Sequence, residues 1–584
     1  MITILENARI VISLLKAHNI RYVVASPGGS NIPIVEAVQQ DPFFKVYSVV
    51  DERSAMYFAI GLYMQTGEII ATSCTSAQAT RNYIPGLTEA FYKHVPILAI
   101  TMSKHPVYVK QDYMQCPIQT SLPVDAVKKS YSLPYVHDDN DRTICVRTAN
   151  EAILELTHHG NGPVQLNIEE LDSETWCFSD SAKLPNPRVI NRYGIEKEWD
   201  VSLDGKKVML LIGEHRPWSN KEIEAIDNFS EAFNVFVYAD NIANYHGKYA
   251  LQPYMISSKC SPKAFVEYGL MPDVVVTIGG ILGEYGIFSK LFNAPIGSVE
   301  HWRVAEDGNV VDTFKKLTKI FECSPAHFLN KLSMGKKSDN HSYYNLWKSF
   351  YDKIERDMEL PLSNLYVAQQ LHNDIPEGST LNFAILNSFR SWLSFPTNAG
   401  INCSCPVAAY GIDGGMSLFF GESVETDKLS FFITGDLAFL YDLNSLSIRH
   451  IKNNVRVILI NNNGGMEFKF GDLVKKFNVG EYVAADNHFK NAKGWAETCG
   501  FEYIGIESTA DFLRSKHLLL EPSKKPIIFE IFTTPENERE AAKLLAKPNM
   551  IFSKNELLKK KLKETVKETI GQKNVTAIKK MIGK

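Results

Sequence analysis

The sequence has no hydrophobic run long enough to cross a membrane. No stretch approaches the roughly 18 to 20 uninterrupted apolar residues that a membrane span needs. An excess of one charge sign is missing too, because 62 basic and 66 acidic residues leave a formal net charge of -4. We therefore expect neither a nucleic-acid partner nor a membrane partner.

Targeting and disulfide signals are also missing. The N-terminal segment has neither a positively charged start nor a small-residue cleavage site, and we interpret it as an amphipathic helix that opens a domain. The nine cysteines are odd in number and scattered along the chain, which is typical of proteins of the reducing cytoplasm. The sequence therefore predicts a cytoplasmic protein.

Strong metal-ligand and dinucleotide patterns are scarce. Cys403 and Cys405 form the only close cysteine pair, and without a neighbouring histidine we interpret them as strand residues. His158 and His159 precede a Gly-Asn-Gly-Pro turn and are expected to end a helix. The glycines at 279–280 are not part of a GxGxxG pattern, so dinucleotide binding is not expected there.

The chain does contain enough apolar material for several large cores. Its 584 residues, 45% of them apolar, predict three or four domains. Buried-type strands alternate with helical patterns, which predicts an α/β fold of doubly wound parallel sheets. Breaks in the pattern divide the chain into three α/β domains and a basic tail, at 1–178, 200–335, 345–540 and 541–584.

The tail is rich in lysine and has helical spacing. We interpret it as a solvated helix packed on a subunit, and binding to an acidic partner or a membrane surface is the alternative. Its apolar positions are Leu557, Leu558, Leu562, Val566 and Ile570.

Polar clusters follow two predicted buried strands in the third domain. The strand at 431–434 ends in Gly435-Asp436, the strand at 455–460 ends in Asn-Asn-Asn-Gly-Gly, and residues 443–451 between them have helical spacing. Neighbouring parallel strands bring their carboxyl ends to one edge of the sheet, where open α/β sheets bind ligands. We therefore expect both clusters to face one ligand.

These clusters carry the oxygen ligands that a diphosphate-bound divalent ion prefers. Asp436 supplies a carboxylate, Asn462 an amide oxygen and Gly464 a backbone carbonyl. The free amides of Leu437 and Ala438, at the helix start, can face phosphate oxygens. A lone Gly-Asp could equally place its aspartate as an N-cap, but the triple asparagine favours the metal-diphosphate interpretation.

The pattern resembles the diphosphate-binding signature of thiamin-diphosphate enzymes, in which Gly-Asp is followed by Asn-Asn one helix and one strand later. The resemblance implies thiamin diphosphate and Mg2+ as cofactors. It makes 1–178 the pyrimidine-binding domain, 200–335 a central domain and 345–540 the diphosphate-binding domain. It also implies that Ile412 is the apolar wedge under a bent cofactor, although Ile412 could equally be ordinary core.

The first domain offers a second test of the resemblance. In that family a carboxylate holds a proton on the aminopyrimidine ring of the cofactor, and Glu52 follows a predicted strand and begins an Ala- and Gly-bearing helix as required. A solvated charged helix start is the alternative for Asp51-Glu52-Arg53. The stretch at 72–106, which reads as strand, turn, helix and strand, supports the catalytic interpretation.

Within that family the chain most resembles the menaquinone-pathway synthases, whose substrates are 2-oxoglutarate and isochorismate. The residues that carry this resemblance are SPGG at 26–29, DERSA at 51–55, CTSAQATRNYIP at 74–85, YGIDGG at 410–415 and NNNGG at 461–465. The resemblance extends to about residue 540 and favours formation of a C–C bond.

Three arginines that clamp substrate carboxylates in those synthases are missing here. The matching positions hold Ser30, Trp392 and Val407, and Arg390 lies two residues from one of them. Because desolvating a polyanion without paired cations costs several kcal/mol per charge, we doubt the menaquinone reaction and expect a smaller or less charged acceptor.

A carboxylate stands where those synthases carry an apolar residue. Glu467 is expected to transfer a proton near the reacting carbon, or else to pair with a surface lysine. The remaining substrate-side residues implied by the resemblance are Ser30, Asn31, Gln119, Ser388, Arg390 and Phe468.

The function predicted from these residues is decarboxylation of a 2-oxo acid, followed by transfer of the acyl-anion equivalent to a carbonyl or alkene acceptor. Simple decarboxylation to an aldehyde is the alternative reaction, and an inactive cofactor-binding scaffold is the alternative of another class. Because Glu52 and Asp436 lie on different domains, which in the family come from different subunits, the resemblance also implies a homodimer or homotetramer.

Overall fold

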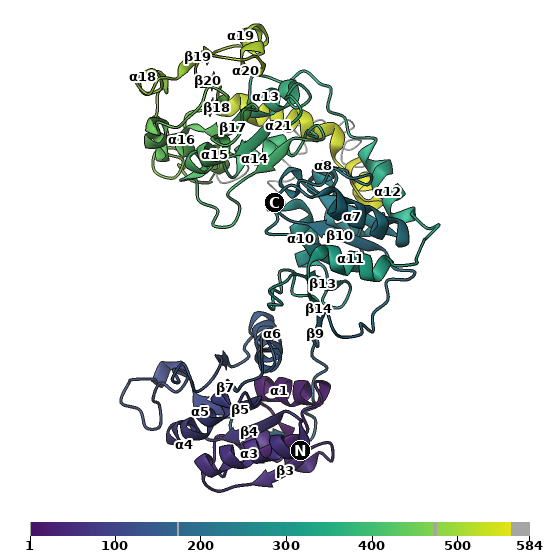
Figure 1. Cartoon of the computed structure of the whole chain (residues 1–584), viewed down its shortest axis with the longest axis vertical. Coiled ribbons are helices and arrows are strands. Elements are labelled where there is room, and N and C mark those ends of the chain that lie inside the picture. The colour runs from purple at the N-terminus through teal and green to yellow at the C-terminus, as the bar shows by residue number, and fades with distance from the viewer. Residues whose placement is uncertain (1, 172–173, 471–475, 562–584) are drawn as a thin grey trace, which may run out of the picture. The chain divides into compact units, whose positions relative to one another are not determined.

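The computed structural model describes residues 2–171, 174–470 and 476–561 (Figure 1). It divides into two compact units, one formed by 1–198 with 306–322 and the other by 199–305 with 323–584. Three parallel sheets with helices between their strands build these units. The α/β class expected from the sequence is therefore confirmed.

The first unit contains a parallel sheet with the strand order β3-β2-β4-β5-β7-β6. Helices α1, α2 and α6 enclose one apolar core and helices α3 and α5 another, so the sheet is covered on both faces. The strands are β2 (Tyr22–Ala25), β3 (Lys45–Ser48), β4 (Ile70–Cys74), β5 (Ile97–Lys104), β6 (Ser130–Leu133) and β7 (Val164–Glu170). The helices are α1 (Glu6–Ala17), α2 (Ile32–Gln40), α3 (Glu52–Thr66), α4 (Gln78–Asn82), α5 (Ile84–Tyr92) and α6 (Asp139–Glu155).

Two short strand pairs complete the first unit. Strands β1 (Ile2–Thr3) and β8 (Phe178–Ser179) pair antiparallel, whereas β9 (Asn191–Gly194) and β14 (Leu317–Glu322) pair in parallel. Ile190, Leu317 and Ile320 form a small apolar core beside the second pair. The segment at 306–322 is therefore packed into the first unit.

The second unit begins with parallel strands in the order β11-β10-β12-β13, which have the buried apolar runs expected from the sequence. These strands are β10 (Val208–Ile212), β11 (Val235–Ala239), β12 (Val274–Ile278) and β13 (Glu300–Val304). The accompanying helices are α7 (Asn220–Ala232), α8 (Tyr254–Lys259), α9 (Pro262–Glu267), α10 (Gly286–Asn293), α11 (Pro325–Ser333) and α12 (Ser342–Tyr351).

The last sheet has the strand order β16-β15-β17-β18-β20-β19 and is parallel throughout. Its strands are β15 (Thr380–Phe383), β16 (Asn402–Ser404), β17 (Ser430–Gly435), β18 (Val455–Asn461), β19 (Glu502–Ile506) and β20 (Ile527–Phe532). The helices around it are α13 (Asn364–Leu371), α14 (Asn387–Trp392), α15 (Gly415–Ser423), α16 (Asp436–Tyr441), α18 (Lys493–Thr498), α19 (Thr509–Ser515), α20 (His517–Leu520) and α21 (Pro535–Asn549).

The prediction of a helix at 443–451 is wrong. Helix α16 ends at Tyr441, and a 3-10 helix, η3 (Leu443–Ser447), follows it. The carboxylate of Asp442 accepts hydrogen bonds from the backbone N–H and the hydroxyl of Ser417, at 2.7 and 2.8 Å. These tertiary bonds fix the chain at the position where the local pattern alone favours a continuous helix.

The C-terminal region continues beyond the expected end of the third domain. Helix α21 crosses residue 540 and buries Ala541 and Leu545 in the core of the last sheet. Leu557 and Leu558 are exposed. The predicted tail positions Leu562, Val566 and Ile570 lie outside the described residues. Across 2–171, 174–470 and 476–561, no helix has the length and apolarity that a membrane crossing requires.

Candidate active site

The two polar clusters of the third domain lie at one edge of the last sheet. Strands β17 and β18 are parallel neighbours whose register pairs Gly435 with Ile460. Asp436 therefore follows the end of β17, and Asn462 follows Asn461, the last residue of β18. This placement confirms the strand arrangement that the sequence predicted.

Asp436 is a buried carboxylate, 2% exposed, at the start of α16. Its Oδ1 accepts the N–H of Leu437 and its Oδ2 accepts the N–H of Gly464, both at 2.8 Å. Burial raises the pKa of Asp436, while these two N–H groups and Lys469 oppose the rise. Each oxygen keeps a lone pair, and a divalent cation would offset the burial of the charge.

The turn after β18 requires glycine at position 464. Gly464 has a φ of 112°, and a Cβ on it would lie 2.5 Å from the carbonyl oxygen of Ala484 and 2.6 Å from Oδ1 of Asp486. Lys469 supports the same turn by donating to the carbonyl of Asn463 at 2.7 Å. The turn thus fits a backbone carbonyl ligand and close approach of a phosphate.

A further acidic side chain at this site had no signal in the sequence. Glu538 on α21 is 4% exposed and lines the same cleft as Asp436. Burial raises its pKa to about 7, while hydrogen bonds from the backbone of Asn364 and the side chain of Asn462 oppose the rise. Glu538 thus positions Asn462, a predicted metal ligand.

Ten of the site residues expected from the sequence line one cleft of the second unit. Ile412 lines it and also packs against the apolar core of the last sheet, so it fits both of its expected roles. The ten residues are Ser388, Ile412, Gly435, Asp436, Leu437, Ala438, Asn462, Gly464, Glu467 and Phe468.

Arg390 reaches this cleft through an ion pair. Its Nη1 lies 2.8 Å from both carboxylate oxygens of Glu467, and the two side chains are half-buried. Burial lowers the pKa of the Arg390 guanidinium, but the hydrogen bond and charge of Glu467 raise it, and the net shift is upward. The guanidinium also lies 5.4 Å from the ring centre of Tyr285. Glu467 therefore pairs with Arg390 rather than with a surface lysine.

The expected site residues of the first unit are held by their own sheet. Glu52 begins α3, is half-buried, and its Oε2 accepts the side-chain N–H of Asn82 at 3.1 Å. Cys74 and Tyr83 beneath it are fully buried. Helix α3 thus begins at the residue that the sequence predicted.

Gln119 is buried, with its amide bonded to the carbonyl of Met102 at 2.7 Å and to Asn167 at 2.9 Å. Asn31 is buried and donates to the carbonyl of Ser26, whereas Ser30 is only half-buried. The substrate roles of these residues stay predictions.

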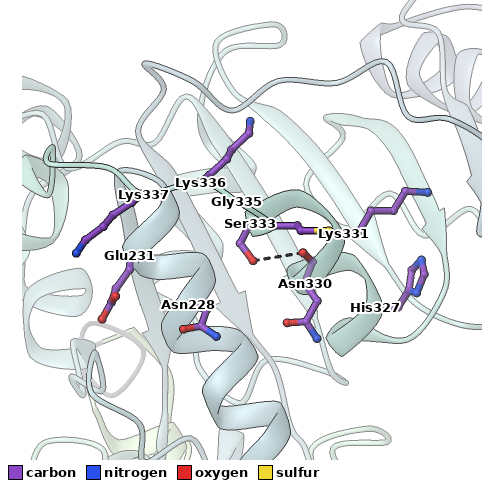
Figure 2. A pocket seen from close by; sticks show the side chains of 10 residues that line it. Asn228, Glu231, His327, Asn330, Lys331, Ser333, Gly335, Lys336 and Lys337 are labelled. Atoms are coloured by element: carbon purple, nitrogen blue, oxygen red, sulfur yellow. Dashed lines mark hydrogen bonds between the residues drawn. The ribbon is translucent and has the colours of Figure 1, made fainter.

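Another hollow lies between α7 and the C-terminal end of α11. Figure 2 shows Lys331, Lys336 and Lys337 around it, with Glu231 on the neighbouring helix. Lys336 pairs with Asp204 at 3.4 Å. The lysines around this open hollow have acidic or aromatic neighbours, and none of its lining residues belongs to the motifs above.

The parallel strand ends, the buried Asp436 and the glycine turn fit an α/β enzyme that binds a diphosphate. Residues 6–122 match the family model for the N-terminal TPP-binding domain of thiamine pyrophosphate enzymes.

Relatives of known function cover most of the chain. A 2-succinyl-5-enolpyruvyl-6-hydroxy-3-cyclohexene-1-carboxylate synthase of Bacteroides fragilis is 31% identical over 560 residues, 92% of this chain and 98% of the relative. The synthase of Phocaeicola vulgatus is 30% identical, covering 91% of this chain and 96% of the relative. That of Flavobacterium johnsoniae is 27% identical, covering 91% and 97%.

The chain belongs to the family of these synthases. It is a thiamin-diphosphate-dependent enzyme of the 2-oxo acid decarboxylase and carboligase type.

Proposed function

We propose that this enzyme decarboxylates a 2-oxo acid without a second carboxylate and transfers the acyl unit to a carbonyl or alkene acceptor. The relatives are named for a product that carries a succinyl group and a carboxylate. The residues of this chain fit the cofactor site of such an enzyme, but Ser30, Trp392 and Val407 stand where the resemblance leads us to expect carboxylate-binding arginines. The proposal concerns that difference.

The ion pair between Arg390 and Glu467 carries the proposal. Arg390 is the cation that reaches the cleft beside Ser388, and an internal carboxylate already occupies it at 2.8 Å. A substrate carboxylate would have to displace Glu467 or share the guanidinium with it. The pairing of Arg390 with an internal carboxylate therefore works against binding of a second substrate carboxylate. The pocket therefore favours a donor whose side chain is uncharged.

The missing clamps support the same conclusion. Trp392 is 0% exposed and Val407 is 1% exposed, and both belong to the apolar core of the last sheet. These two side chains stabilise the domain by burial and carry no positive charge. Ser30, at the third position, has no charge to offer.

The residues present fit the cofactor and a metal ion. Asp436, Asn462 and the carbonyl of Gly464 would hold Mg2+, and the N–H groups of Leu437 and Ala438 would face the diphosphate. When bound, thiamin diphosphate supplies an electron sink for loss of CO2. Glu52 would hold a proton on the pyrimidine ring from the first unit. The ion pair with Arg390 supports an orienting role for Glu467 over proton donation.

The proposal extends to a homo-oligomeric assembly and to a cytoplasmic location. Glu52 and Asp436 belong to different compact units. A homodimer or homotetramer would let units of different subunits enclose each cofactor and exclude water. The scattered cysteines are consistent with the cytoplasm.

Product analysis tests the reaction type. The purified enzyme, supplied with thiamin diphosphate and Mg2+, is incubated with carbon-labelled 2-oxo acids, with and without aldehyde or alkene acceptors. The masses of the products are then measured by mass spectrometry. A product one acyl unit heavier than the acceptor supports the proposal. Free aldehyde whatever the acceptor would make it a simple decarboxylase, and no CO2 from any donor would make it an inactive scaffold.

A further inference from the structure

A cluster of metal-ligand side chains lies in the first unit, away from the residues assigned to the cofactor. His158 and His159 follow α6, and Glu322 is the last residue of β14. One ligand atom from each of the three lies within 4.8 Å of the other two. The cluster thus joins two segments that are far apart in the sequence.

The backbone holds the two imidazoles side by side. His159 has a φ of 52°, in the left-handed region that non-glycine residues rarely adopt. Its ring centre lies 4.0 Å from that of His158, and its Nε2 lies 3.3 Å from Oε1 of Glu322. An uncommon backbone conformation therefore brings two imidazoles to one carboxylate.

Both ring nitrogens of His158 face acceptor oxygens. Its Nδ1 faces Oε2 of Glu155 at 3.2 Å, and its Nε2 faces the carbonyl oxygen of Asp307 at 3.0 Å. Both partners only accept hydrogen bonds, whereas a neutral imidazole donates from one nitrogen and carries a lone pair on the other. A metal ion on the lone pair of one nitrogen would leave the other nitrogen to donate its N–H to an acceptor. His158 is 8% exposed, so bulk water contributes little.

We infer that His158, His159 and Glu322 form a structural Zn2+ site, with Glu155 or water as the fourth ligand. Two imidazoles with carboxylate oxygen suit Zn2+ in a tetrahedral arrangement. Bonds of about 2.0 Å separate tetrahedral ligands by roughly 3.3 Å, so the cluster must contract slightly. His159, with a 60% exposed side chain, has the freedom to do so. The carbonyl of Asp307 then accepts the remaining N–H of His158, as the partners of zinc-bound histidines usually do.

Neighbouring cations moderate the affinity. Lys128 lies 3.6 Å from Glu155, and Arg192 lies 3.9 Å from Glu322. These charges compete with the ion for the carboxylates, so we expect weaker binding than at a site built from thiolates. A bound ion would hold the 306–322 segment against the end of α6 and stabilise the first unit.

Metal analysis of the full-length protein tests this site. The protein is stripped with chelator, supplied with excess Mg2+ and thiamin diphosphate to fill the cofactor site, and titrated with Zn2+ alone before metal content is measured. We expect about one zinc per chain, lost in both His159→Gln and Glu322→Gln. His94→Gln is the matched control, because His94 is exposed and its backbone is also in the left-handed region, with a φ of 55°.

Cobalt absorption provides a readout that does not depend on how stable the variants are. Co2+ at a tetrahedral nitrogen and oxygen site gives visible bands without thiolate charge transfer, and His94→Gln should retain them. The inference would be overturned if the unaltered protein held no zinc after dialysis. It would also be overturned if the zinc content were the same in His159→Gln, Glu322→Gln and His94→Gln. Strong thiolate bands would also overturn it, because they would place the metal on cysteines.

Discussion

Arg390 places a single nitrogen, Nη1, 2.8 Å from both carboxylate oxygens of Glu467, in the cleft that also holds Asp436. The pair neutralises the arginine from within the protein. In a site adapted to a dicarboxylic donor, the substrate would be expected to supply that carboxylate. Substrate choice therefore depends on Glu467 as much as on Arg390.

Glu467→Gln should free Arg390 to pair with a substrate carboxylate. A charge-assisted hydrogen bond contributes about 1.5 to 3 kcal/mol, so kcat/KM for 2-oxoglutarate relative to an uncharged 2-oxo acid should rise by about 10- to 100-fold. Steady-state CO2 release from both donors measures the ratio. Glu425→Gln, a change at an exposed glutamate, should leave it unaltered. An unchanged ratio in Glu467→Gln would mean that the ion pair does not govern specificity.

Glu52→Gln should stop turnover without preventing cofactor binding. Loss of a positioned proton-transfer group typically lowers the rate by about 10²- to 10⁴-fold. Asp51→Asn is the matched control, because Asp51 caps α3 through the N–H of Ser54 at 3.1 Å and asparagine can do the same. Cofactor-induced fluorescence quenching and CO2 release are measured on each. Full activity in Glu52→Gln would remove it from the mechanism.

Asp436→Asn should weaken binding of the metal and the diphosphate together. Replacing the only carboxylate among the proposed ligands removes the charge that balances the ion, so affinity should fall by more than the roughly 10- to 100-fold typical of an outer-shell change. Calorimetric titration with thiamin diphosphate at fixed Mg2+ measures it, and exposed Asp427→Asn is the control. If Asp436→Asn and the Asp427→Asn control bound thiamin diphosphate with equal affinity, Asp436 would not be a ligand of the metal.

Asp240→Asn should stabilise the second unit at alkaline pH. Asp240 follows β11, is 7% exposed, and accepts the N–H groups of Ile242 and Ala243. Burial and Glu284 raise its pKa from 3.8 to about 7. The stability that this group contributes is therefore complete below about pH 4 and is lost as the pH rises through 7.

Asparagine keeps one acceptor oxygen and removes the buried charge. The gain in melting temperature of Asp240→Asn over the unaltered enzyme should thus be larger at pH 8 than at pH 5.5. Asp200→Asn, a change at an exposed position, should show no such difference. A gain that does not depend on pH would contradict the assignment of the shift.

Local sequence was sufficient to predict which residues line the same cleft where they come from short consecutive motifs. Gly435-Asp436 and the asparagines after β18 are short motifs at strand ends, and the parallel register brings them together. The ion pair was not predictable, because Arg390 and Glu467 are 77 positions apart and each has several possible partners. Glu538 was missed for the same reason, since its environment is set by the packing of α21.

Single-turnover CO2 release from a panel of 2-oxo acids tests the central claim most directly. Enzyme in excess, with thiamin diphosphate and Mg2+, is mixed with donors whose side chains are uncharged or carry a second carboxylate. Faster release from a small uncharged donor than from 2-oxoglutarate is the result we predict. Faster release from 2-oxoglutarate, with turnover that requires isochorismate, would show that this pocket accepts a dicarboxylic donor despite the pairing of Arg390 with Glu467.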